Sequence, residues 1–187
     1  ASCDGSTYLA NSNVVTLTVN ETIYYVNDNS TSGDKWCTAV GNDANAGTSA
    51  SAPKLTLASA LSVAGCGSVI RVDKGTYTDD KLDLTSTHDG TTIIGAGRDN
   101  TIFDQSGSGD HFIEIKSSAT NITISDMTIK DYDEADNGGA IDITSGGTIT
   151  MEDITFDTKL KRRWHRWTLP PVFFFKALNS VAAGGTR

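Results

Sequence analysis

The stretch Asn121-Ile-Thr-Ile-Ser-Asp-Met-Thr-Ile-Lys-Asp131 decides the fold, because it returns downstream as Thr148-Ile-Thr-Met-Glu-Asp-Ile-Thr-Phe-Asp157 at an offset of 27 residues. Phe112-Ile-Glu-Ile115 likewise returns as Ala140-Ile-Asp-Ile143 at an offset of 28, and Leu82-Asp-Leu84 precedes it by 31. A repeat in the high twenties that is carried by short strands is typical of a solenoid. Stacked strands would place Ile on Ile and Asp on Asp about 4.8 Å apart. The sequence therefore predicts an all-β fold, a right-handed parallel β-helix (solenoid).

Alternation along these strands gives each one an apolar and a polar face. We expect the apolar side chains to fill the lumen of the coil and the polar ones to form the outer walls. The lumen residues predicted in this way are Ile113, Ile115, Ile122, Ile124, Ile129, Ile141, Ile143, Ile149, Met151 and Phe156.

Charge is divided unevenly along the 187 residues. Residues 1–158 carry all 23 acidic residues and a net charge of −15, whereas residues 159–187 carry seven basic residues and no acid. An acidic body does not suit nucleic acid, whose phosphates require a basic surface. It suits a solvated extracellular protein, a cation-binding protein or a partner of neutral glycans. No apolar run approaches the length of a membrane span.

The first residue is Ala1, and we expect it to be a mature N-terminus left by removal of a signal peptide, so that the protein is secreted or displayed at the cell surface. The three cysteines are an odd number, which leaves one unpaired or paired elsewhere. We expect a disulfide between Cys37 and Cys66, with Cys3 left over; the alternative is three inert thiols. Three Asn-x-Thr sequons begin at Asn20, Asn29 and Asn121, and the sequence does not say whether they are used.

The N-terminal part divides into an entry region and a cap. Residues 1–52 read as an N-terminal strand and a turn-rich entry loop. Residues 53–158 read as the coils, preceded by a short amphipathic helix over 54–64 that begins after Pro53 and ends at Gly65. Such a helix would cover the open edge and apolar disc that end a solenoid.

Several short motifs stand out in this region: Tyr25-Val-Asn-Asp28, Val40-Gly-Asn-Asp-Ala-Asn-Ala-Gly47, Ala52-Pro-Lys54, Leu57-Ala-Ser-Ala-Leu61, Ile70-Arg-Val72, Gly75-Thr-Tyr77 and Thr92-Ile-Ile-Gly-Ala-Gly97. Together they resemble the N-terminal part of secreted right-handed parallel β-helix proteins of the pectin-lyase-like superfamily. The resemblance covers roughly residues 24–158 and implies the fold and the entry topology. That superfamily includes lyases, hydrolases, epimerases and adhesins, so the resemblance does not choose an activity.

The character of the chain changes at Lys159. Residues 159–187 form a basic, aromatic tail, and Pro170 and Pro171 stand where the next inward strand is due. A one-base shift of frame from Lys159 would restore a Gly-rich turn like that of the preceding coil. We interpret the tail as a non-solenoid segment and a frameshift or splicing product, with a real arm for an anionic surface as the alternative. We expect it to be irregular, with no strand in the 27/28 register.

Three groups of residues are candidates for chemistry. Asp131, Asp133 and Asp136 lie in an acidic stretch whose spacing could wrap a hard cation, so we expect any metal site there, with Ca²⁺ as the ion; the alternative is a solvated acidic turn. Asp126 and Asp153 should stack on adjacent coils, either as an acid/base pair or, as we favour, as turn residues that bond backbone N–H groups. We interpret His88 and His111 as exposed turn residues.

No residue is assigned a catalytic or cofactor-binding role, because no Ser/His/Asp signature, P-loop or dinucleotide-binding fingerprint occurs. We therefore predict a secreted or surface-displayed, non-catalytic β-helix module that binds a polysaccharide or cell-surface glycan, or mediates adhesion. The alternative is a truncated polysaccharide lyase or glycoside hydrolase whose active coils are missing. A third interpretation, ice binding by ranks of Thr, fits only part of the register.

Overall fold

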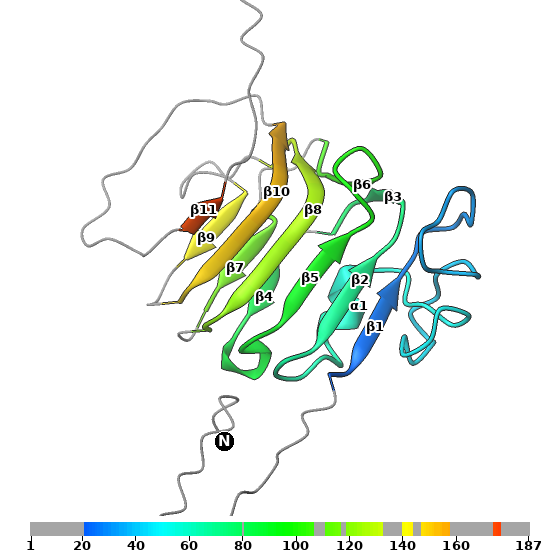
Figure 1. Cartoon of the computed structure of the whole chain (residues 1–187), viewed down its shortest axis with the longest axis horizontal. Helices are drawn as coiled ribbons and strands as arrows, with labels where there is room; N and C mark the ends of the chain where they lie inside the picture. Colours follow the sequence, from blue (N-terminus) through cyan, green and yellow to red (C-terminus); the bar gives the residue numbers. More distant parts are fainter. Residues whose placement is uncertain are drawn as a thin grey trace, which may run out of the picture.

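The structure is a computed structural model, and it describes residues 21–79, 81–106, 111–116, 119–132, 140–143 and 147–157, with the backbone of 174–176. The chain winds into a parallel β-helix, as predicted (Figure 1). All of the strand pairs are parallel, and most join strands from successive coils. The crossovers of such parallel strands are right-handed as a rule.

Each full coil has three walls. The first wall runs through β1 (Ile23–Val26), β2 (Val69–Val72), β5 (Thr92–Gly95), β8 (Ile122–Lys130), β10 (Ile149–Asp157) and β11 (Phe174–Lys176). The second pairs β3 (Gly75–Tyr77) with β6 (Thr101–Asp104), and β6 with the second half of β8. The third is the separate sheet of β4 (Leu82–Leu84), β7 (Ile113–Ile115) and β9 (Ile141–Ile143).

The long strands β8 and β10 turn a corner in their middle. Asp126 and Asp153 adopt positive φ angles of 60° and 51° there, and the pairing register skips both. Asp126 also accepts a hydrogen bond from the hydroxyl of Ser125, 2.9 Å away. Gly95 lies beside this corner, where a side chain would collide with the carbonyl oxygen of Asp126. The two aspartates therefore lie at the corner, as predicted, but the Asp126 carboxylate accepts from a hydroxyl rather than from a backbone N–H.

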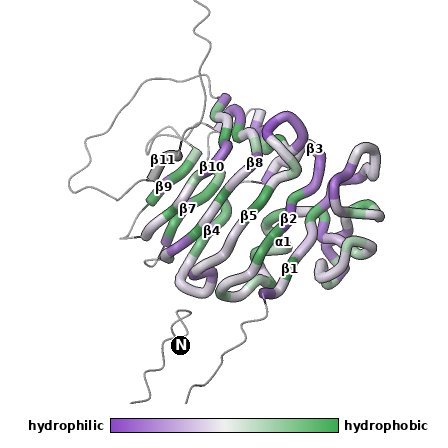
Figure 2. Tube along the Cα trace, viewed as in Figure 1, coloured by the Kyte–Doolittle hydropathy of each residue, from purple (hydrophilic) through white to green (hydrophobic). Residues whose placement is uncertain are grey.

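The lumen is apolar and closely packed. Hydrophobic positions recur along strands such as β2, β5 and β7 (Figure 2). Ile93, Ile124 and Met151 follow one another in register on successive coils. A stack of aromatic rings lines another side, with centroids 5.2, 4.6 and 5.3 Å apart along Tyr77, Phe103, Phe112 and Tyr132. Of the ten predicted lumen residues, seven are buried: Ile113, Ile115, Ile122, Ile124, Ile129, Ile149 and Met151.

The prediction is wrong for Phe156, whose side chain is 43% exposed, and Ile141 and Ile143 are only partly buried. Phe156 pairs in register with Ile129, so it points to the same side of the sheet. It lies in β10, the last long strand of the described stack, where fewer side chains are available to cover it.

The helix of the entry region, α1, spans Leu57–Leu61 and is shorter than the expected 54–64. Thr56 caps it by accepting a hydrogen bond from the backbone N–H of Ser59, and Leu57, Ala60 and Leu61 are buried in the end of the lumen. The entry loop pairs with the free edge of β1: the Tyr25 N–H donates to Gly47 O at 2.7 Å and the Asn27 N–H donates to Lys54 O at 2.9 Å. Loop and helix together cover the first edge of the solenoid.

Asp73 fastens the entry loop to the first coil. Its fully buried carboxylate accepts four backbone hydrogen bonds, at 2.6 Å from Lys35, 2.7 Å from Trp36, 2.6 Å from Cys37 and 2.8 Å from Lys74. Burial alone would raise the pKa of Asp73, but these four hydrogen bonds outweigh it and lower the pKa. The carboxylate is therefore stable inside the fold as an anion.

The tail meets the described part of the chain at β11. Phe174 pairs with Thr150 of β10, an offset of 24 residues rather than 27 or 28. The tail therefore contains a strand, so the expectation that it is irregular is wrong at this point, although the strand is not in the 27/28 register. The rest of 159–187 lies outside the described residues, so the domain limits and the frameshift interpretation stay predictions. No helix in the described part of the chain has the length and apolarity needed to span a membrane.

We expect Ile124→Ala to lower the free energy of unfolding by about 2–5 kcal/mol, because it removes a fully buried side chain from the middle of the stack. Thr123→Ala, next to it on the outer face, should change it by less than about 1 kcal/mol. Urea denaturation followed by circular dichroism measures both. Equal losses in the two variants would contradict the assignment of the faces.

We expect Asp73→Asn to destabilise the protein by about 2–4 kcal/mol, because the amide NH₂ cannot accept the bonds that one carboxylate oxygen now accepts. Since the folded pKa is lowered, the stabilisation by Asp73 is present above the pKa of the unfolded chain, about 3.9, and is lost as pH falls through the folded pKa. Denaturation midpoints between pH 2 and pH 7 should thus fall less steeply with acid in the variant. Parallel curves for the two proteins would argue against this role.

Candidate functional site

Three acidic residues stack on the outer face of the third wall. Asp83 of β4 pairs in register with Glu114 of β7, and Glu114 pairs with Asp142 of β9. They arise because each strand has the pattern apolar–acidic–apolar, which turns the two apolar residues inward and the acid outward. We call this row the acidic ladder (Asp83, Glu114 and Asp142).

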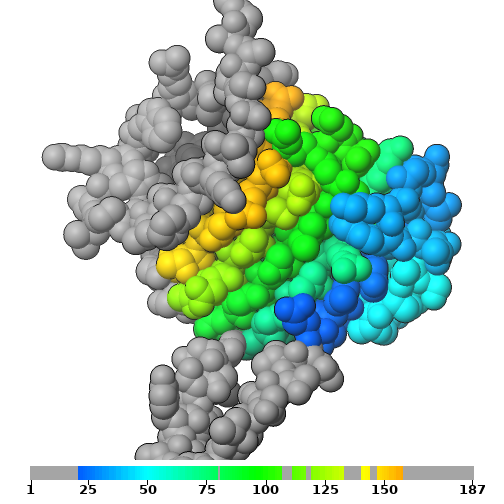
Figure 3. Space-filling view, in the orientation of Figure 1, coloured from blue at the N-terminus to red at the C-terminus, as the bar shows by residue number. Residues whose placement is uncertain are grey.

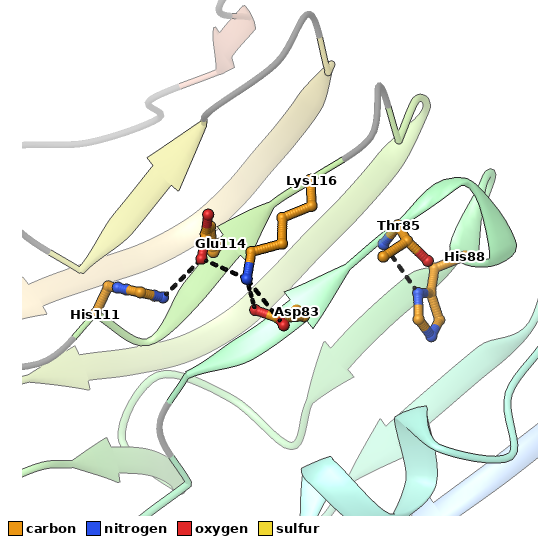
Figure 4. A network of polar contacts seen from close by, with 6 residues as sticks. All are labelled: Asp83, Thr85, His88, His111, Glu114 and Lys116. Atoms are coloured by element: carbon orange, nitrogen blue, oxygen red, sulfur yellow. Dashed lines mark hydrogen bonds and ion pairs between the residues drawn. The ribbon is translucent and has the colours of Figure 1, made fainter.

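A lysine joins two members of the ladder (Figure 4). The ammonium of Lys116 lies 3.0 Å from each carboxylate oxygen of Asp83 and 2.9 Å from Oε2 of Glu114. Hydrogen bonds to Glu114 and to Asp83 raise the pKa of Lys116. This lysine therefore remains an ammonium ion at neutral pH and is a poor general base.

His111 completes the network. Its Nε2 lies 3.6 Å from Oε2 of Glu114, on the side away from Lys116 (Figure 4). The side chain of Glu114 is 16% exposed and that of Asp83 49% exposed, so the pair has one sheltered and one open carboxylate.

An open pocket of about 500 Å³ lies beside the network, between α1 and β4. Its size falls within the range of small-molecule sites. Leu61 and Leu82 contribute apolar surface, whereas Ser62, Lys81 and Asp83 bring polar groups. Asp83 thus belongs both to the pocket and to the network with Lys116.

Both helical elements beside the pocket are held by hydrogen bonds. The 3₁₀ turn η1 (Ser86–His88) is tied to α1, because Nε2 of His88 lies 3.2 Å from Leu61 O while its Nδ1 accepts from the Thr85 N–H at 3.1 Å. Asp79 accepts a hydrogen bond from the Ala58 N–H at 2.9 Å, which fixes the start of α1. Neither histidine is exposed: His88 is 9% and His111 7% exposed, so that prediction is wrong.

The metal site predicted from the sequence consists of Asp131, Asp133 and Asp136, which are different residues from those of this network. Asp133 and Asp136 lie outside the described residues, and the Asp131 carboxylate lies 3.7 Å from the ammonium of Lys130. Within the described ranges, a second set of possible ligands is Asp83, His111 and Glu114, whose ligand atoms lie within 4.8 Å of one another. Two carboxylates and an imidazole suit a divalent transition metal. Lys116 occupies the position between the two carboxylates, so a cation would have to displace it.

Sequence reasoning missed the acidic ladder, although its signal is visible. The strands Leu82-Asp-Leu84, Ile113-Glu-Ile115 and Ile141-Asp-Ile143 each carry an acid at the centre. The offsets of 31 and 28 align these strands correctly, but alternation alone predicts only that the acids lie on the outer wall. Lys116 and His111 come from turns at the two ends of β7, where the repeat gives no information.

The cysteine prediction is also wrong. Cys66 is disulfide-bonded, but Cys37 is a buried free thiol. Cys37 lies in the entry loop with its side chain buried; its N–H donates to Asp73, and its Sγ is 3.8 Å from Val26 O. The partner of Cys66 lies outside the described residues.

Comparison with known proteins gives a fold likeness and no family. No family model and no curated protein matches the sequence. Three similar solved structures are a pectin methylesterase variant with hexasaccharide IV (16% identity, TM-score 0.48), a pectin methylesterase with hexasaccharide VII (17%, 0.47), and pectin methylesterase PemA from Erwinia chrysanthemi (15%, 0.48). Each match covers 75% of this chain and 46% of the solved one, so the chain spans about half the length of these proteins.

These comparisons correct the functional prediction. All three solved structures are of enzymes, two of them in complex with hexasaccharides, and none is of an adhesin or a non-catalytic module. The expectation of a non-catalytic glycan-binding or adhesive module is therefore wrong as the main interpretation. The enzyme alternative is better supported.

We expect Glu114→Gln to lower the pKa of Lys116, because the variant removes the charged hydrogen bond that contributes most to raising it. Asp104→Asn is the matched control, since Asp104 lies 2.9 Å from Lys130 and raises the pKa of that lysine instead. NMR titration of the lysine ¹³Cε signals distinguishes the two. A Lys116 that titrates at the same pH in wild type and Glu114→Gln would show that the network does not form in solution.

Proposed function

We propose that this chain is the N-terminal part of a hydrolytic enzyme that acts on a polysaccharide, with Asp83 and Glu114 as its pair of reacting carboxylates. One observation carries the proposal: an oxygen of Asp83 and an oxygen of Glu114 lie within 4.8 Å of each other, and Asp83 also lines an open pocket of about 500 Å³. A sugar ring fits a pocket of that size, and hydrolysis of a glycosidic bond needs two carboxyl groups.

The spacing of the pair favours a covalent route. Enzymes that activate a water molecule directly keep their two carboxyl groups roughly 6.5–9.5 Å apart, whereas those that form a glycosyl intermediate keep them at about 5–5.5 Å. In such enzymes one carboxyl group donates a proton to the leaving oxygen and the other attacks the sugar carbon, so the sugar must displace the ammonium of Lys116 from between Asp83 and Glu114. Water then hydrolyses the intermediate, with the first group acting as base. The same two carboxyl groups, one as acid and one as nucleophile, could also cleave an ester substrate.

The protonation of Lys116 argues against β-elimination. A polysaccharide lyase needs a basic side chain that removes a proton next to the uronate, together with a cation that neutralises the carboxylate. Lys116 contacts both carboxylates, and its pKa is raised rather than lowered. We therefore assign it the role of a counter-ion that holds Asp83 and Glu114 together until a substrate binds.

Secretion is part of the same proposal. The disulfide at Cys66 supports it, because disulfides persist in oxidising compartments and are rare in the cytosol. Peptide mapping of the non-reduced protein from culture supernatant provides the test. A reduced Cys66 in protein that accumulates inside the cell would contradict secretion.

The activity test uses the purified chain on a panel of polymers that includes methyl-esterified pectin, polygalacturonate, xylan and a mixed-linkage glucan. New reducing ends report hydrolysis, released methanol reports ester cleavage, and absorbance near 235 nm reports elimination. We expect one of the first two signals, reduced at least about 100-fold in Asp83→Asn and in Glu114→Gln. Asp104→Asn, which breaks a lysine–carboxylate pair on another wall, should retain it. Unsaturated products, full activity in both variants, or no product from any polymer would refute the proposal.

A further inference from the structure

Cationic and aromatic side chains alternate where the entry loop meets the first wall. The guanidinium of Arg71 lies 5.9 Å from the ring centroid of Tyr25 and 5.6 Å from that of Trp36, and the ammonium of Lys35 lies 4.5 Å from the Trp36 ring. All three distances are within the range of cation–π contacts. We call this surface the cation–aromatic platform (Tyr25, Lys35, Trp36 and Arg71).

The platform is open to solvent and held firmly from below. Tyr25, Trp36 and Arg71 are half-buried and Lys35 is exposed. Tyr25 and Arg71 are in-register partners on the outer faces of β1 and β2. The backbone N–H groups of Lys35 and Trp36 donate to the buried carboxylate of Asp73, so the loop that carries the Trp36 ring is fixed before any ligand arrives.

The two cations of the platform form no ion pair within the described part of the chain. Lys116 and Lys130 are both taken up in ion pairs, but Arg71 and Lys35 form none with any other described residue. Asp73, which accepts the backbone N–H groups of Lys35 and Trp36, is buried and has both oxygens occupied by backbone donors. The chain as a whole has a net charge of −8, so these two cations form a local positive site on an acidic protein.

We propose that the cation–aromatic platform binds an anionic polysaccharide, separately from the pocket at the acidic ladder. A guanidinium fork fits a carboxylate or a sulfate with two hydrogen bonds, and an aromatic ring offers a flat apolar face on which a sugar ring can lie. The row that starts at Tyr25 and Arg71 continues across the wall through Ile94, Ser125 and Glu152.

A polymer suits this surface better than a small anion. The outer face is a continuous set of parallel bands of side chains from β1 to β10, with the entry loop beside the β1 and β2 bands (Figure 3). Successive strands are spaced about 4.8 Å apart, so a chain of sugars can cross several of them. Glu152 at the other end of the row would repel an anion, which places the acidic sugar at the platform. This inference takes only the polysaccharide class of ligand from the proposed function and does not need the hydrolytic step.

Affinity gel electrophoresis with three polymers tests the proposal: alginate carries carboxylates, dextran sulfate carries sulfates, and dextran carries no charge. We expect the wild-type chain to be retarded by alginate, by dextran sulfate or by both, with at least tenfold weaker binding in Arg71→Gln and in Trp36→Ala. Arg98→Gln removes a positive charge from an exposed turn elsewhere and should bind like wild type. Added salt should weaken the binding.

Thermal denaturation shows whether the Trp36→Ala protein is still folded. If it is not, the comparison of Arg71→Gln with wild type still tests the proposal. The double variant with Asp83→Asn and Glu114→Gln should bind the anionic polymer normally even if it lacks all hydrolytic activity. Loss of binding in that double variant, unchanged binding in Arg71→Gln, or equal retardation by neutral dextran would each overturn the platform. Binding to one anionic polymer alone supports it and identifies which acidic group it recognises.

Discussion

The parallel ladder between coils is the constraint on which the rest of the structure depends. Ile93, Ile124 and Met151 can fill one lumen only because each lies directly beside its neighbour in register. A slip of one residue would turn a whole strand over and bring its polar face inside. The same register that stacks the core therefore also stacks whatever faces outward. The acidic ladder and the row that begins at Tyr25 and Arg71 both follow from packing the lumen, before any selection for binding.

The first edge of the solenoid is closed by hydrogen bonds as well as by apolar packing. An open strand edge presents unpaired backbone groups, and here the entry loop supplies their partners. That loop has little apolar surface of its own, so buried polar residues hold it. Asn27 donates to three acceptors, among them Ala39 O at 2.8 Å, and Asp73 accepts four N–H groups. The platform residues Lys35 and Trp36 are thus positioned by the same carboxylate that closes the edge.

The repeat between residues 121–131 and 148–157 was enough to predict the coil and most of its lumen, because alternation and offset are local properties of the sequence. Burial that depends on distant partners was not predictable in this way. His88 looks like a turn residue, but its Nε2 meets the carbonyl oxygen of Leu61, 27 residues earlier. Phe156 has the right alternation and lacks cover. The acidic ladder is visible in the sequence as the central residue of three aligned strands. Its contacts with Lys116 and His111 are not, because those two residues come from the turns that flank β7.

Cys37 gives the entry loop an internal reporter. Burial, and next the charge of Asp73, raise the pKa of the Cys37 thiol to about 12, so almost none of it is thiolate at neutral pH. Thiol reagents attack the thiolate, and in the closed loop they also lack access to it. The rate at which Cys37 is alkylated therefore measures how often the loop detaches from the first coil. An unpaired cysteine in a chain that also contains a disulfide is in this way kept out of thiol exchange by the same carboxylate that closes the fold.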